Sequence, residues 1–84
     1  MDVATTSLSE RIARALAGLD RSANAEGGEV SASASVDETW HDYLGQADAV
    51  LRTIREPSGR MSAVGNPKVW AAMVDAAVAE SETI

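Results

Sequence analysis

The chain has 84 residues and carries seven Lys and Arg against thirteen Asp and Glu, a formal net charge of −6. So acidic a chain has little scope for releasing counterions from phosphates, and we expect no nucleic-acid partner and no binding to an anionic membrane surface. The absence of cysteine excludes disulfides, thiolate catalysis and cysteine-ligated metals.

The first six residues carry neither the basic start nor the apolar segment of a secretion signal. No run of about eighteen apolar residues occurs in the chain, so the sequence predicts no membrane-spanning helix. We therefore predict a cytoplasmic protein. A single helical domain should cover residues 1–84, with frayed tails at 1–6 and 81–84.

A first helix is predicted over residues 7–19. Ser7 with Glu10 three residues later has the spacing of a capping box at a helix start. Its apolar positions recur on one face, at Leu8, Ile12, Ala15, Leu16 and Leu19.

Residues 20–34 are predicted to form a flexible loop. The segment is rich in small and polar residues, and Gly27-Gly28 lies at its centre. It is long for a connection between helices, which usually takes about two to eight residues. We expect either a mobile linker or a functional loop.

A long second helix is predicted over residues 36–55. Ser35 and Glu38 again have the spacing of a capping box, and Pro57 stops the run. The predicted buried face consists of Trp40, Leu44, Ala47, Leu51 and Ile54.

A short helical turn should follow at residues 58–65, with Met61 and Val64 facing inward. Asn66 and Pro67 are typical of a new helix start, because Asn caps well and Pro is tolerated in the first turn. The last helix is predicted to run from residue 67 to about residue 79, with Trp70 on its apolar face.

These elements predict an all-α fold, a small bundle of three principal helices with a short helical turn between the second and third. The chain contains no Phe, so the two indoles of Trp40 and Trp70 should supply much of the core. We expect both to be mostly buried and to lie near each other.

The polar residues suggest no catalytic centre. His41 is the single histidine, and Asp37 lies four residues before it on the predicted second helix. A metal site needs more ligands than this pair, and an acid–base role would need a positioned nucleophile. We therefore expect no enzyme, no cofactor and no bound metal.

The apolar positions exceed what three short helices can bury internally. Sixteen alanines also contribute little area each, so a monomer gains limited hydrophobic stabilisation. We expect a non-catalytic interaction or assembly module, most simply a homodimer, with Val50 and Val69 as candidate contacts.

The alternative is a small regulatory protein that presents an acidic helix to a basic protein. Asp37 and Asp42, with Glu38 and Asp48, make the first part of the second predicted helix acidic. The same residues also suit a solvated surface, since an acidic first turn complements the helix dipole. Of these two interpretations of the acidic residues, we favour the solvated surface.

A set of residues outside the predicted loop resembles a known group. The residues that carry the resemblance are the run from Glu10 to Leu16, then Trp40, Tyr43, Ala47, Leu51, Arg55, Glu56, Pro57, Met61, Gly65, Trp70 and Met73. Together they are similar to short bacterial hypothetical proteins, often encoded near phage-derived genes. The resemblance implies a bacterial or phage-linked origin and a cytoplasmic setting, and it transfers no activity and no functional residue.

Overall fold

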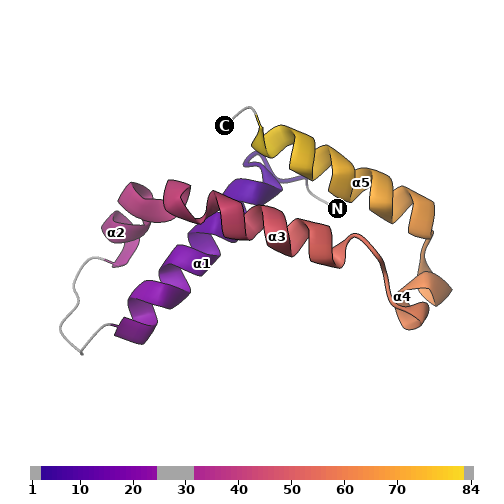
Figure 1. The fold of residues 1–84 in the computed structure, drawn as a ribbon, viewed down its shortest axis with the longest axis horizontal. Coiled ribbons are helices and arrows are strands. Elements are labelled where there is room, and N and C mark those ends of the chain that lie inside the picture. Colours follow the sequence, from indigo (N-terminus) through magenta and orange to yellow (C-terminus); the bar gives the residue numbers. More distant parts are fainter. Residues whose placement is uncertain (1–2, 25–31, 83–84) are drawn as a thin grey trace.

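The computed structural model describes residues 3–24 and 32–82, and every regular element in that part of the chain is a helix (Figure 1). The elements are α1 (Leu8–Asn24), α2 (Ala32–Thr39), a 3₁₀ turn η1 (Trp40–Tyr43), α3 (Leu44–Ile54), α4 (Gly59–Val64) and α5 (Pro67–Ser81). The predicted small all-α bundle, with a short helix between its last two principal helices, is confirmed. None of the described helices is long and apolar enough to cross a membrane.

Helix α1 begins as predicted and ends later. The Ser7 hydroxyl accepts the backbone N–H of Glu10 at 3.2 Å, which satisfies one of the free amides of the first turn. The Glu10 carboxylate accepts a hydrogen bond from Arg14 Nε at 2.8 Å. Gly18 lies inside the helix, where one glycine costs only about 1 kcal/mol relative to alanine, so α1 continues to Asn24.

The prediction of a loop over residues 20–34 is wrong at both ends. Residues 20–24 belong to α1, and α2 begins at Ala32. Ser35 therefore lies inside α2 and does not cap it. Alanine and serine alternate there, and the alanines favour helix strongly enough to extend it before the predicted start. Residues 25–31, which include Gly27-Gly28, lie outside the described residues.

The predicted single helix over residues 36–55 is interrupted by the 3₁₀ turn η1. Five consecutive residues of weak helix propensity lie there, from Thr39 to Tyr43, so local preference does not hold a regular α-helix. Thr39 has φ −115° and ψ −10°, and Tyr43 has φ −101° and ψ 4°, both outside ideal α-helical values. Packing of Trp40 into the bundle then decides the local geometry.

Trp40 is the centre of a first hydrophobic cluster, between α1 and the η1–α3 segment. Its side chain is 6% exposed and packs among three buried alanines, Ala13, Ala17 and Ala47. Small residues let the helices approach closely around the indole ring. The Arg14 guanidinium covers the ring at 5.2 Å from its centroid, a cation–π arrangement.

A second cluster joins α3 to α5 and includes Trp70. Its buried residues are Leu51, Val74 and Ala77. Trp70 is half-buried there, and its indole Nε1 donates to the backbone oxygen of Ile54 at 2.6 Å, near the end of α3. The prediction that Trp40 and Trp70 lie near each other is wrong, because each belongs to a different cluster.

Two polar contacts fix α5 on the other helices. The buried Ser9 hydroxyl of α1 donates to the Ala77 backbone oxygen at 3.3 Å. Arg55, just after α3, donates to Asp75 from Nε at 2.7 Å and from Nη2 at 3.1 Å. The hydrogen bonds from Arg55 hold the pKa of the Asp75 carboxyl below its ordinary value.

This ion pair predicts an acid dependence of stability. The pKa of Asp75 is lower in the folded chain than its ordinary value of 3.8, so the pair stabilises the fold fully above that value and loses its effect as pH falls below it. Both side chains are exposed, so we expect a small change. Urea midpoints of the unmodified chain and Asp75→Asn should differ near about pH 7, and the difference should shrink as pH falls below 3.8. A difference that is constant with pH would contradict this assignment.

Candidate interaction surface

Helix α5 is apolar on two faces, and the bundle covers one of them. The inner residues, Trp70, Ala71, Val74, Ala77 and Val78, are buried or half-buried against α3 and α1. A second set follows the same three- and four-residue spacing on the other side: Val69, Ala72, Met73, Ala76 and Ala79. All five are exposed, and we call them the outer face of α5. A helix that is apolar all round is normally buried all round, so the outer face needs explanation.

The outer face combines two large side chains with three small ones. Val69 is 55% exposed and Met73 is 63% exposed. The alanine side chains project little from the helix, so another helix can approach closely between and beyond Val69 and Met73. The first turn of α5 is held in place by Asn66, whose Oδ1 accepts the backbone N–H groups of Lys68 at 2.9 Å and Val69 at 3.2 Å. The predicted Asn66 cap is thus confirmed.

Helix α4 projects beside the start of α5, at the far end of the molecule from α2 (Figure 1). Ser58 caps it by accepting the Met61 backbone N–H at 3.2 Å. It has no buried residue and makes no substantial contact with another described helix. The prediction that Met61 and Val64 face inward is wrong: Met61 is 44% exposed, and Val64 is more exposed still. A helix of this length is only marginally stable by itself. Helix α4 also lacks the tertiary packing that usually stabilises such a helix.

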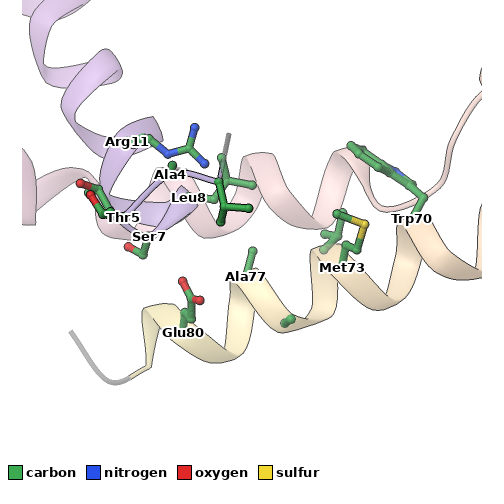
Figure 2. Close-up of a pocket in the computed structure, with 13 residues that line it drawn as sticks. Ala4, Thr5, Ser7, Leu8, Arg11, Trp70, Met73, Ala77 and Glu80 are labelled. Carbon is green, nitrogen blue, oxygen red and sulfur yellow. The ribbon is translucent and has the colours of Figure 1, made fainter. Parts of the chain in front are cut away.

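Two hollows flank the side chains of Trp70 and Met73, which line both. One, of about 210 Å³, lies between α4 and α5 and includes Met61 and Val69. The other, of about 290 Å³, lies between the amino-terminal segment, the start of α1 and α5, with Leu8 at its wall (Figure 2). Sites for small molecules usually have about 300–1,000 Å³, so the smaller hollow lies below this range and the larger one at its lower limit.

The two predicted apolar contacts lie in different surroundings. Val69 lies on the outer face of α5 and lines the hollow beside α4. Val50 lies on α3, is 36% exposed and lines neither hollow. Its exposed neighbours include Arg52 and Thr53, which are polar. The structure therefore does not bring Val50 and Val69 together around one hollow.

The predicted acidic surface is partly neutralised inside the chain. Asp37 of α2 forms an ion pair with Arg14 of α1. Asp48 of α3 forms another with Arg52, at 2.8 Å. Asp42 is exposed in η1. Two of these acidic residues, Asp37 and Asp48, thus already bind cationic side chains of the same chain.

His41 is an exposed residue whose ring stacks on Trp40, with 3.6 Å between ring centroids. The Asp37 carboxylate, its predicted neighbour, bonds to Arg14. Among the described residues no group of three or more His, Cys, Asp or Glu side chains could hold a metal ion.

Sequence reasoning missed part of this surface. It placed Met61 inward and did not single out Ala76 or Ala79. The signal that could have found them is the repeat of the helical apolar spacing on the second side of α5, starting at Val69. That pattern shows that one packed face cannot account for all the apolar positions.

A scan against protein-family models found no match for this chain, and neither did searches of curated proteins and of solved structures. Its own exposed apolar side chains and charges are therefore what bear on its function.

Proposed function

We propose that this chain is a non-catalytic helical module that self-associates, and that the outer face of α5 is the surface it buries. The observation that supports this most is the double apolar face of α5, of which α1 and α3 cover one side. A second copy supplies an identical face, and two-fold pairs of identical surfaces are the commonest form of soluble oligomer.

The exposed side chains offer a sufficient driving force. Fully burying a Val or Met side chain stabilises by about 1.5–3 kcal/mol relative to leaving it exposed. Val69 and Met73 are each more than half exposed, so burying the rest of each side chain in an interface would contribute roughly half of that free energy. In a two-fold dimer each copy buries both residues, so the stabilisation is doubled and offsets part of the entropy cost of association.

The size of the exposed surface agrees with this proposal. The chain exposes 6074 Å². A compact monomer of 8.8 kDa is expected to expose about 4,800 Å². The radius of gyration, 15.1 Å, is likewise above the roughly 12 Å expected for a chain of this length.

The acidic-helix alternative has less support. Asp37 and Asp48 each bind an arginine of the same chain, so the acidic surface offers fewer uncompensated charges than the sequence indicates. Self-association through an apolar face also has a different signature, because it should weaken little as salt rises.

The test compares the two valines that the sequence singles out. Val69→Glu places a charge on the outer face of α5, so it should convert the dimer to monomer at concentrations of about 100 μM. Val50→Glu introduces the same charge on α3, away from both hollows, and should leave the dimer unchanged. Sedimentation velocity gives the mass, and circular dichroism checks that helix content is kept.

Loss of the dimer in Val50→Glu but not in Val69→Glu would move the interface to α3 and contradict the proposed surface. A steep loss of association of the unmodified chain as salt rises would favour a charged contact over an apolar one.

A further inference from the structure

The longest stretch of the chain without an acidic residue includes α4 and the first half of α5. It covers residues 57–74 and is twice as long as the next such stretch, residues 11–19. Its two charged residues are Arg60 and Lys68. In a chain whose net charge is −6, this segment therefore carries a local charge of the opposite sign.

The two cations of this segment are exposed and lack an acidic partner in the described part of the chain. The acidic residues that flank the segment are Glu56 and Asp75. Both lie beside Arg55, which forms an ion pair with Asp75. The positive charges of Arg60 and Lys68 are therefore available to a binding partner.

The hollow of about 210 Å³ between α4 and α5 lies inside the same segment. All of its lining residues fall within residues 57–74, so none of them is acidic. Its large apolar side chains are Met61 on α4 and Val69, Trp70 and Met73 on α5. Arg60 directly precedes Met61, and Lys68 directly precedes Val69. A cation thus adjoins the wall that each helix contributes.

The polar groups at this hollow are mainly hydrogen-bond donors. The Trp70 indole Nε1 already donates to the Ile54 backbone oxygen, so Trp70 offers the hollow an apolar ring. The Asn66 Oδ1 already accepts two backbone N–H groups, which leaves the side-chain amide nitrogen as a donor. A complementary partner therefore needs apolar side chains flanked by negatively charged acceptors.

We propose that the hollow between α4 and α5 binds a short amphipathic segment of another protein, with apolar side chains in the hollow and Asp or Glu side chains on Arg60 and Lys68. This inference goes beyond the proposed self-association and does not rest on it. Val69 and Met73 belong both to the hollow and to the outer face of α5. The acidic segment and a second copy therefore compete for these two side chains.

A short acidic segment fits this site better than an extended polyanion. Exposed charges interact chiefly within the Debye length, about 8 Å at physiological salt, so a short segment senses mainly Arg60 and Lys68. A nucleic acid or an anionic membrane also meets the acidic residues of the rest of the chain, whose net charge is −6. Two cations give little compensation for that repulsion.

The test uses a synthetic peptide and the tryptophan fluorescence of the intact chain. The probe has about twelve residues, no aromatic residue, and two leucines four positions apart with glutamate beside each. Trp70 lines the hollow, so binding should shift the emission to shorter wavelength, with a dissociation constant of about 100 μM or below at low salt. A probe with glutamine in place of glutamate should bind about threefold more weakly or worse.

The apolar part of the site is tested by two substitutions on α4. Met61 lines the hollow and is 44% exposed, so Met61→Ser should raise the dissociation constant of the acidic probe about fivefold. Val64 lies on the same helix, is 89% exposed and does not line the hollow. Val64→Ser should therefore leave binding unchanged.

The charged part is tested by Arg60→Glu and Lys68→Glu, each of which should raise the dissociation constant about threefold or more at low salt. The control is Arg11→Glu, which makes the same change of net charge. Arg11 is exposed and lines the other hollow (Figure 2), so this variant should bind the probe as the unmodified chain does. Circular dichroism checks that each variant keeps its helices.

Three results would overturn the proposal. Equal binding of the glutamate and glutamine probes would show that charge does not select the partner. Equal weakening by Arg11→Glu and Lys68→Glu would place the probe elsewhere or leave only an effect of net charge. An emission shift with vesicles containing phosphatidylserine, and none with the acidic probe, would replace the protein segment with a membrane surface. The probe measurements need about 1 μM protein and apply whether or not the chain self-associates.

Discussion

Replacing Trp40 with alanine should lower the free energy of unfolding by about 3–5 kcal/mol. The indole is 6% exposed, and the buried residues packed with it, Ala13, Ala17 and Ala47, are too small to fill the space it leaves. The larger side chains beside this cluster, Ile12, Val36, Tyr43 and Leu44, relax only in part, so a cavity remains and the substitution is costly. A domain of 84 residues typically has a total stability of about 4–13 kcal/mol, so this loss removes a large share of it.

Urea denaturation followed by circular dichroism measures this effect. The control is Leu19→Ala on α1, where the side chain is exposed and the cost should stay within about 0.5 kcal/mol. If Trp40→Ala were as mild as the control, the first cluster would not depend on the indole.

Leu51→Ala should have the second largest effect, about 2–5 kcal/mol. Leu51 is fully buried on α3 and belongs to the cluster that holds Val74 and Ala77 of α5. Its loss loosens the contact between α3 and α5, and the outer face is then held less firmly. We therefore expect a lower unfolding free energy and also weaker self-association, although Leu51 does not reach the surface.

The matched control is Val50→Ala, the neighbouring residue on α3, whose side chain is 36% exposed. It should lower the unfolding free energy by no more than about 1 kcal/mol and leave the dimer intact. Equal effects of the two substitutions in urea denaturation would contradict the burial of Leu51.

The parts of the fold that depend on short stretches of sequence were predictable. Ser7 and Asn66 cap α1 and α5 as expected, because a cap is decided by a few neighbouring residues. The apolar spacing of the principal helices likewise predicted an all-α bundle. These features follow from local chemistry, which the sequence contains in full.

The features that depend on distant contacts were not predictable in the same way. The 3₁₀ turn η1 forms where Trp40 packs against α1, far away in sequence. The separation of Trp40 and Trp70 into two clusters depends on how α3 and α5 meet, which helix periodicity alone does not determine. The early start of α2 shows that helix propensity prevailed over a plausible capping pattern at Ser35.

The candidate surface was predictable in part. A surplus of apolar positions on the last helix was evident from the sequence, and Val69 lies on the exposed face. The orientation of α4 was not, because a six-residue helix has too few residues for a face to be assigned. Met61 lines a hollow open to solvent where the pattern predicted an inward side chain.

The most direct test of self-association is the mass of the unmodified chain in solution. Sedimentation equilibrium at protein concentrations from about 1 to 100 μM covers the dissociation constants expected for a specific interface of modest size. The proposed burial of the outer face of α5 predicts a mass that rises toward twice 8.8 kDa across this range and changes little with salt. A mass that stays at 8.8 kDa up to about 100 μM would contradict self-association through α5.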